Sequence, residues 1–249
     1  MEVDPQTGVL KRAGVESKMN PYDLYALETA FRIREEVGGS VHVISMGPPQ
    51  AQQVIREAFA MGADGGTLLS DRKFGGADVL ATSYTLAQGI KSCGDFDLIL
   101  CGKQTTDGDT AQVGPQIAEQ LHVPQVSYAE ELKVEGDSVI VKRQFEDQAH
   151  MLKVKTPCLI TALSELNEAR YMSVGGIFEC YNKPLEIYNF ETLKDDPLIE
   201  LDTIGLKGSP TNVYKSFSPP QKGAGMMLEG ADKATCEKLV SLLAEKHII

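Results

Sequence analysis

The chain alternates between short apolar segments and segments with helical periodicity, and this alternation limits the folds that are open to it. The strand-like segments are residues 41–45, 67–70 and 97–101, and the helical ones are residues 50–61, residues 78–90 and a segment after Thr110. Regular alternation of this kind is typical of parallel sheets with right-handed crossovers. The sequence therefore predicts an α/β fold with a doubly wound, mainly parallel sheet.

Three polar or glycine-rich turns follow the predicted strands, at residues 46–49, 70–78 and 102–109. In open parallel sheets, ligands bind beyond the carboxyl ends of the strands. The third turn continues to Pro115 and joins its strand to a helix rich in small residues. Glycine lets the backbone approach a ligand, and the free N–H groups of a helix start attract an anion. This segment is therefore either a nucleotide-phosphate site or an ordinary turn between a strand and a helix.

The second half of the chain has a different pattern. Residues 126–154 are rich in strand-forming side chains, which predicts a β-hairpin extension. The stretch from 164 to 230 carries several prolines and little periodicity, and Asp232 can cap a final helix with an apolar stripe. That helix packs either on its own core or on another subunit. We expect an α/β domain with a hairpin extension over residues 1–163 and an extended C-terminal arm over residues 164–249.

Composition excludes several classes of function. The formal net charge of −11 argues against a nucleic-acid-binding protein, because phosphates are neutralised by clustered Lys and Arg. The five cysteines show no C-x-x-C spacing, so we expect no metal site. No apolar run approaches the roughly 20 residues that span a bilayer, and we expect a cytoplasmic protein without a membrane span. The histidines and possible nucleophiles form no recognisable catalytic pattern.

Six short motifs occur in order along the chain. They are Asn20-Pro-Tyr-Asp23, Ser45-Met-Gly-Pro48, Ala60-Met-Gly-Ala-Asp64, the segment from Gly102 to Gly114, Leu166-Asn-Glu-Ala-Arg-Tyr171 and Gly205-Leu-Lys-Gly-Ser-Pro-Thr211. Together they resemble the beta (small) subunit of electron-transferring flavoprotein over nearly the whole chain. The resemblance implies a Rossmann-like fold that binds an adenine nucleotide. It also implies a heterodimer with a larger alpha subunit, which has a mobile FAD domain and is wrapped by the C-terminal arm.

The resemblance leaves open which nucleotide this subunit holds. One branch of the family holds AMP as a structural ligand, and the other holds a second FAD that takes a hydride from NADH and divides its electrons between two acceptors. The segment from Ser70 to Ser83, the turn at Gly47 and the run from Asp107 to Val113 resemble the second, bifurcating branch. We therefore expect FAD as the cofactor and NADH as the substrate. The expected acceptors are ferredoxin or flavodoxin and, through the alpha-subunit FAD, a flavin dehydrogenase.

The resemblance also implies the residues that bind the cofactor. They are Asn20, Pro21, Tyr22, Asp23, Met46, Gly47, Ser70, Asp71, Arg72, Phe74, Gly102, Asp107, Gly108, Asp109, Thr110, Ala111, Gln112, Val113 and Gly114. No residue is expected to be catalytic, because hydride and electron chemistry belong to the flavin. Asp107 and Asp109 would repel a phosphate, so each is expected to accept from a ribose hydroxyl or an adenine amine, or to cap a helix. Arg72 either lies near NADH and the flavin or is a solvated surface charge.

Two departures from the family pattern affect this interpretation. Family members begin with a strand before the segment matched by residues 3–8, so we expect the true chain to carry about 15 to 20 further residues, one strand and its loop. The segment after Tyr171 occupies the place of the family's recognition loop for dehydrogenases, and the expected docking residues are Val174, Gly175, Gly176 and Ile177. The glycine pair and Glu179 depart from the usual loop. The dehydrogenase is therefore either of the acyl-CoA type typical of the family or of a 2-hydroxyacid type, such as one acting on lactate.

Two other functions remain open. A conventional electron-transferring flavoprotein with structural AMP would share these motifs. An adenine-nucleotide sensor of similar α/β architecture would explain the sheet and the loop after Gly102, but not the proline-bearing arm.

Overall fold

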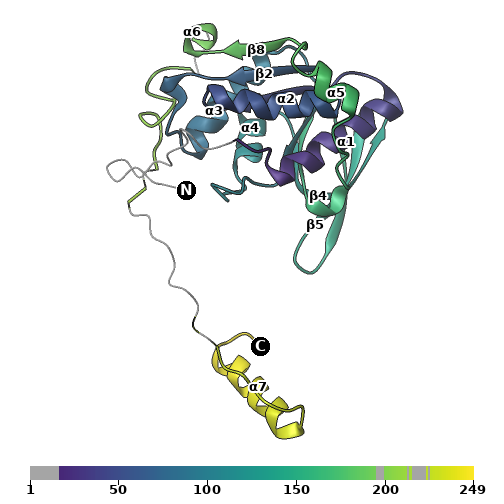
Figure 1. The fold of residues 1–249 in the computed structure, drawn as a ribbon, viewed down its shortest axis with the longest axis vertical. Helices are drawn as coiled ribbons and strands as arrows, with labels where there is room; N and C mark the ends of the chain where they lie inside the picture. Colours follow the sequence, from purple (N-terminus) through teal and green to yellow (C-terminus); the bar gives the residue numbers. More distant parts are fainter. Residues whose placement is uncertain (1–16, 195–198, 212, 215–222, 224) are drawn as a thin grey trace. The chain divides into compact units, whose positions relative to one another are not determined.

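The computed structural model describes residues 17–194, 199–211, 213–214, 223 and 225–249. The chain divides into two compact units, residues 1–214 and residues 215–249. Strands and helices alternate along the first unit as far as residue 121, and four consecutive strands follow between residues 125 and 162 (Figure 1). Its strands are β1 (His42–Met46), β2 (Gly65–Leu69), β3 (Leu98–Gly102), β4 (Gln125–Glu135), β5 (Ser138–Gln144), β6 (Ala149–Lys155), β7 (Cys158–Ala162) and β8 (Leu185–Tyr188). Its α-helices are α1 (Pro21–Val37), α2 (Gln52–Met61), α3 (Val79–Ser92), α4 (Val113–Leu121), α5 (Val174–Glu179) and α6 (Phe190–Leu193), with short 3-10 turns at Pro49–Ala51, Arg72–Phe74 and Ser164–Leu166.

The strands form two sheets. The first has the order β1-β2-β8 and is parallel throughout. The second has the order β3-β7-β4-β5-β6; β3, β7 and the start of β4 run parallel, whereas β4, β5 and β6 form antiparallel hairpins. The predicted α/β class, with a mainly parallel core and a hairpin extension, is confirmed.

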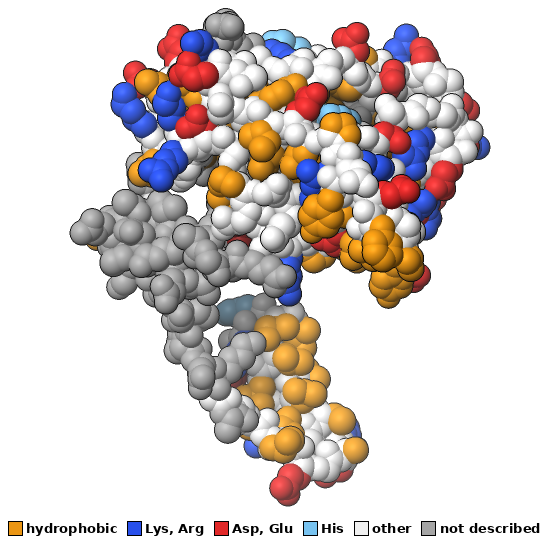
Figure 2. Space-filling model, turned by 45° about the horizontal axis from the view of Figure 1, so that its top comes forward, with side chains coloured by type: hydrophobic (Ala, Val, Ile, Leu, Met, Phe, Trp, Pro, Cys, Tyr) orange, Lys and Arg blue, Asp and Glu red, His pale blue; other side chains and the backbone are white. Residues whose placement is uncertain are grey.

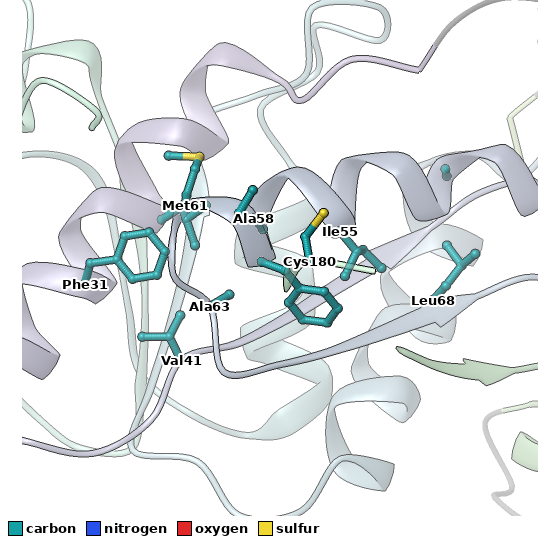
Figure 3. Packing of buried hydrophobic residues seen from close by; sticks show 12 residues of the cluster. Phe31, Val41, Ile55, Ala58, Met61, Ala63, Leu68 and Cys180 are labelled. Carbon is teal, nitrogen blue, oxygen red and sulfur yellow. The ribbon is translucent and has the colours of Figure 1, made fainter. Parts of the chain in front are cut away.

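One face of the three-stranded sheet is covered by α2, and α1, which lies mainly against β3 and β7 of the second sheet, joins α2 through the cluster drawn in Figure 3. Phe31 of α1, Ile55 of α2 and Leu68 of β2 are fully buried there. Gly66 in β2 permits this close packing, because a Cβ at that position would lie 2.4 Å from the Cγ2 atom of Ile55. A glycine inside a strand often marks a place where another element packs closely on the sheet.

The opposite side of the fold is covered by α3 and α4. Ala87 and Ile90 of α3 pack with Ile117 of α4, and partly buried side chains from both sheets, Ile44 of β1 and Ile99 of β3, join the same cluster. Helices therefore lie on both sides, as the doubly wound prediction requires. β1 and β3 are each the last strand of a sheet. The additional strand that the family pattern leads us to expect before residue 3 stays a prediction.

The hairpin extension has its own apolar core. Val139 and Val141 of β5 point inward with Val126 of β4 and Ile160 of β7. Lysines on the outer positions pair with acidic side chains of neighbouring strands, as Lys142 does with Glu131 at 2.9 Å. The alternation of inward apolar and outward charged residues is what a sheet with one covered face requires.

The segment after residue 163 contains more regular structure than its sequence indicates. β8 adds to β2 as a parallel strand, with Gly66 opposite Leu185 and Leu69 opposite Tyr188. The sequence analysis did not predict β8, because a segment of four half-exposed residues is too short to show a periodic pattern. The boundary expected between residues 163 and 164 stays a prediction.

The second unit contains helix α7 (Lys233–Glu245). The Asp232 side chain accepts a hydrogen bond from the backbone N–H of Thr235 over 2.9 Å, so the predicted cap is confirmed.

Candidate functional site

The carboxyl end of β3 and the N-terminal end of α1 meet at a polar junction. The backbone N–H of Gly102 donates to Oδ1 of Asp23 over 2.6 Å. The Asn20 side chain donates through Nδ2 to Oδ2 of Asp23 over 2.9 Å and to the carbonyl oxygen of Gln104 over 2.8 Å. Two predicted cofactor-binding segments that are far apart in the sequence are therefore adjacent in the fold.

Glycine is required at the end of β3. A Cβ on Gly102 would lie 2.6 Å from the carbonyl carbon of Tyr22 and 2.8 Å from the backbone nitrogen of Asp23. Backbone atoms cannot move aside as a flexible side chain can, so any larger residue would separate α1 from β3. Pro21 opens α1, a position at which proline is favoured because the N–H it lacks would be unpaired anyway.

The polar groups at this junction are not all satisfied by the protein. Oδ1 of Asn20 is buried and has no hydrogen-bond partner within the described residues. An orphan acceptor of this kind costs about 1–3 kcal/mol and readily accepts an N–H or O–H from a ligand. Burial raises the pKa of Asp23, although the hydrogen bonds from Asn20 and Gly102 act in the opposite direction. Burial likewise raises the pKa of the Cys101 thiol, with a further contribution from Asp23, so this thiol stays protonated.

The loop between β3 and α4 carries the next predicted residues, and residues 105–110 are exposed. Asp107, Gly108 and Thr110 lie in this exposed part. Asp109 and Ala111 adopt left-handed backbone conformations, with φ of 54° and 55°. The carboxylate of Asp109 accepts a hydrogen bond from the side chain of Gln104, so it is turned toward the end of β3. Left-handed conformations cost a non-glycine residue roughly 1–2 kcal/mol, which makes this loop less stable than an ordinary turn.

Helix α4 begins directly after this loop. The residue before it, Gln112, makes no side-chain capping bond within the described chain, so the N–H groups of Val113 and Gly114 lack a side-chain cap. Gly114 packs closely on the sheet, since a Cβ there would lie 2.8 Å from Sγ of Cys101. An uncapped helix start carries free donors and partial positive charge, which suits a phosphate. The acidic loop residues suit hydroxyl or amine donors instead.

A second group of predicted residues follows β1 and β2. The N–H of Gly47 donates to the carbonyl oxygen of Leu69 over 3.0 Å, and the N–H of Ser70 donates to a carbonyl oxygen of β8 over 2.8 Å. Met46 packs against the core cluster that contains the buried Phe74. Phe74 therefore has a structural role at this end of the sheet, while Ser70 lies half-buried at the strand exit.

In this second group, Asp71 links two separate segments of the backbone through its carboxylate. Its carboxylate accepts from the backbone N–H of Lys73 and from that of Phe190, both over 3.0 Å. Burial acts to raise the pKa of Asp71, but these hydrogen bonds and the Lys73 charge outweigh it and lower the pKa overall. Arg72 beside it is exposed.

The motif from Gly205 to Thr211 is hydrogen-bonded to the loop after β2 and to the start of α3. Gly205 has φ of 57°, and the N–H of Leu206 donates to the carbonyl oxygen of Gly75 over 3.0 Å. Asp78 caps α3 and also accepts from the N–H and the hydroxyl of Thr211, over 3.0 and 2.7 Å. The sequence analysis assigned no role to Asp78, although an Asp directly before a helical pattern is the usual signal of a cap.

We define the docking segment as residues 171–181, which include α5. Of the predicted docking residues, Val174, Gly175 and Ile177 are exposed and Gly176 is half-buried. The sequence analysis missed four further exposed apolar side chains in this segment. They are Tyr171 (96% exposed), Phe178 (77%), Tyr181 (74%) and Met172 (44%). Figure 2 shows hydrophobic side chains gathered on the visible face of the molecule. The spacing of residues 174, 177, 178 and 181 is the signal that could have revealed them, because it places side chains on one helical face.

The two glycines of the docking segment differ in their surroundings. A Cβ on Gly176 would lie 2.2 Å from the carbonyl oxygen of Ala60, whereas a Cβ on Gly175 would meet open space. Ser173 caps α5 through its hydroxyl, which accepts from the N–H of Gly176 over 2.9 Å. Gly176 is therefore explained by the packing of α5 on the end of α2.

The second unit also exposes apolar side chains. Leu239 and Val240 on α7 and the terminal Ile248 and Ile249 are exposed, and Figure 2 shows hydrophobic side chains along this helix. A helix with a bare apolar face is stable only when another surface covers it.

Other features of the described chain add no cofactor site. A cavity of about 360 Å³ lies between α1 and β4, where Ile33 and Leu132 line it together with charged side chains. Among the residues that the structure describes, no cluster of His, Cys, Asp and Glu could hold a metal ion. None of the helices in the described part is long and apolar enough to cross a membrane.

Comparison with known proteins identifies the family. The family model described as electron transfer flavoprotein domain matches residues 7–184. The electron transfer flavoprotein subunit beta of Thermoanaerobacterium thermosaccharolyticum is 49% identical over 100% of this chain and 94% of its own length. The acryloyl-CoA reductase electron transfer subunit gamma of Anaerotignum propionicum is 53% identical over 97% of this chain and 92% of its own length. The caffeyl-CoA reductase-Etf complex subunit CarD of Acetobacterium woodii is 51% identical over 100% of this chain and 94% of its own length.

Proposed function

The chain belongs to the electron transfer flavoprotein family as a beta subunit, and we propose that it works in a heterodimer with a larger alpha subunit and holds a nucleotide at the strand ends. The observation that carries the nucleotide proposal is the polar junction of α1 and β3. There, a buried amide oxygen of Asn20 lacks a partner, and the neighbouring loop leads into the uncapped start of α4. Groups left unsatisfied by the protein are the groups that a ligand can satisfy.

FAD is the nucleotide that we propose. Oδ1 of Asn20 would accept from a ligand N–H or O–H group, and the N–H groups that start α4 would hold the diphosphate. Asp107 and Asp109 would accept from hydroxyl groups of the ligand. Arg72, exposed after β2, would lie nearer the flavin ring or NADH. The bound flavin would supply hydride and single-electron chemistry, while the protein supplies binding, orientation and exclusion of water.

The reaction that we propose is oxidation of NADH with division of its electrons between two acceptors. One acceptor would be ferredoxin or flavodoxin. The other would be a flavin dehydrogenase, reached through the FAD of the alpha subunit. The local resemblance of residues 70–83 to the bifurcating branch supports this proposal.

An acyl-CoA type of dehydrogenase is the favoured partner. Two relatives carry names that assign them to an acryloyl-CoA reductase and a caffeyl-CoA reductase. The alternative of a lactate-type partner rests on the glycine pair and on Glu179 of the docking segment, and the contact with Ala60 gives Gly176 a packing reason instead. The partner would contact the exposed side chains of the docking segment, with Val174 and Phe178 among them. The apolar face of α7 would be covered by the alpha subunit.

Counting nucleotides in the purified heterodimer tests the proposal. Two FAD and no AMP, together with NADH-driven reduction of ferredoxin, are expected. One FAD plus one AMP would contradict bifurcation and leave a structural nucleotide in simple electron transfer. Failure to isolate any alpha partner would favour the adenine-nucleotide sensor.

A further inference from the structure

The docking segment is fastened to the body of the protein by polar contacts on its inner side, while its apolar side chains face outward. We propose that Arg56 and Arg170 are positioning residues that hold this segment in its partner-binding conformation before the partner arrives. The inference rests on the proposed function, because it assumes that residues 171–181 contact the dehydrogenase. Neither arginine lies among the expected contact residues themselves.

Arg170 fixes the beginning of the docking segment to α1. Its Nε donates to the buried carboxylate of Glu28 over 2.7 Å, and its Nη1 donates to Glu35 over 2.6 Å. The guanidinium also lies 5.0 Å from the ring centroid of Phe31. Glu28 is held from its other side by Nε of Arg32 over 2.8 Å. The residue directly before Tyr171 is therefore fixed by charge-assisted bonds, and the one to Glu28 involves a buried carboxylate.

Arg56 of α2 fixes the end of the segment. Its Nη1 donates to the carbonyl oxygens of Cys180 and Lys183, each over 2.7 Å. Its guanidinium lies 5.6 Å from the ring centroid of Phe59 and 5.8 Å from that of Tyr181. A planar guanidinium can bond to two carbonyls while its flat face lies against aromatic rings, whereas the ammonium of a lysine has no flat face and ends a shorter side chain.

Between the two arginines, α5 rests on the end of α2. The N–H of Ser173 donates to the carbonyl oxygen of Ala60 over 3.3 Å, and Gly176 packs over the same carbonyl. The segment is thus held at both ends and in the middle, through groups that do not point to the partner. A binding surface that is already ordered loses less conformational entropy on association. Loosening it should weaken partner binding and leave the flavin reactions unchanged.

The test uses the heterodimer and measures electron delivery to a purified acyl-CoA reductase-type flavin dehydrogenase at increasing dehydrogenase concentration. Arg56→Lys and Arg170→Lys should each raise the KM for the dehydrogenase about tenfold, because a loosened segment loses conformational entropy when the dehydrogenase binds. Both should keep the flavin content and kcat. Hydrogen exchange should become faster in residues 171–181 and stay unchanged in α3.

Arg34→Lys is the matched control. Arg34 also donates to a backbone carbonyl, that of Gly62, over 2.8 Å, and contacts the Phe31 ring, but it does not touch the docking segment. Its KM should equal that of the wild type. An unchanged KM in Arg56→Lys and Arg170→Lys would overturn the positioning role.

Substitutions on the surface itself separate this inference from the proposed function. Val174→Asp and Phe178→Ala should raise the KM directly. If they do and the arginine variants do not, only the positioning role is refuted. If none of the four has an effect, the docking assignment is wrong.

Discussion

Replacing Glu28 by Gln is expected to lower the free energy of unfolding by about 3 kcal/mol. The Glu28 side chain is only 4% exposed, and its two oxygens accept from Nε of Arg32 at 2.8 Å and from Nε of Arg170 at 2.7 Å. Hydrogen bonds to charged groups contribute roughly 1.5–3 kcal/mol, and breaking a buried ion pair costs about 3–5 kcal/mol. Glutamine keeps one acceptor oxygen, so one arginine contact survives and the lower part of this range applies.

Thermal unfolding followed by circular dichroism measures this effect. In a protein of this size, 1 kcal/mol shifts the Tm by about 2–4 °C, so the Tm of Glu28→Gln should fall by roughly 6–12 °C. Glu35→Gln is the control, because Glu35 pairs with the same Arg170 but its side chain is 54% exposed. Exposed pairs contribute at most about 1 kcal/mol. Equal losses in the two variants would refute the reasoning from burial.

The effect of Glu28→Gln should also depend on pH. Burial acts to raise the pKa of Glu28, but the hydrogen bonds from Arg170 and Arg32 outweigh it, and the pKa lies below its ordinary value of 4.5. A carboxylate with a lowered pKa stabilises the native state above its unfolded-state pKa and loses that contribution as the pH falls through the native pKa. The stability difference between wild type and variant should therefore be full above about pH 5 and shrink on further acidification.

Three further variants give separate tests. Gly102→Ala should lower stability by about 1–3 kcal/mol and reduce the nucleotide bound per heterodimer, because the new Cβ would lie 2.6 Å from the Tyr22 backbone; full nucleotide content would contradict the proposed site. His122→Gly should raise the Tm by roughly 2–4 °C, since exposed His122 ends α4 with φ of 56° and glycine removes about 1 kcal/mol of strain; a lower Tm would disprove this. Val174→Asp should slow electron delivery to the dehydrogenase with unchanged flavin content, whereas Val37→Asp, at an exposed site on α1, should change neither.

The fold was predictable where a segment was long enough to show a regular spacing of apolar residues. The helix of residues 50–61 and the strand of residues 41–45 were recognised because apolar residues recur at the spacing of their structure. β8 was not recognised, because it has only four residues and is a strand only through its pairing with β2. Strand pairing depends on the tertiary fold, which no short window of sequence contains.

The contacts of the candidate site residues within the fold could not be predicted from the sequence. On resemblance, Asp71 and Phe74 are expected to bind a cofactor, which stays a prediction; in the structure, Asp71 also accepts from two backbone N–H groups and Phe74 is buried in the core. Gly176 was interpreted as a docking feature and proves to touch Ala60. Such roles depend on contacts between distant parts of the chain. Asn20 and Gln104 meet for the same reason, and no spacing rule connects them.

Three departures from local rules lie together at the proposed nucleotide site. Helices α3, α5, α6 and α7 each begin with a side-chain cap, whereas α1, α2 and α4 do not. At the site, α4 begins without one, Ala111 is left-handed, and the amide oxygen of Asn20 is buried without a partner in the described chain. Departures from local rules that persist in a well-packed protein are expected where a ligand compensates for them.

The uncapped start of α4 leads to a prediction about the loop before it. Adding FAD to nucleotide-free heterodimer should slow hydrogen exchange at residues 110–114, because the ligand would occupy N–H groups at the helix start that no side chain caps. Residues 138–144 of the hairpin extension, whose N–H groups are already in a sheet, should show no change. Slowing at both places would indicate general stabilisation by mass action rather than local contact. Slowing at neither would place the nucleotide elsewhere and remove the physical reason for the uncapped helix.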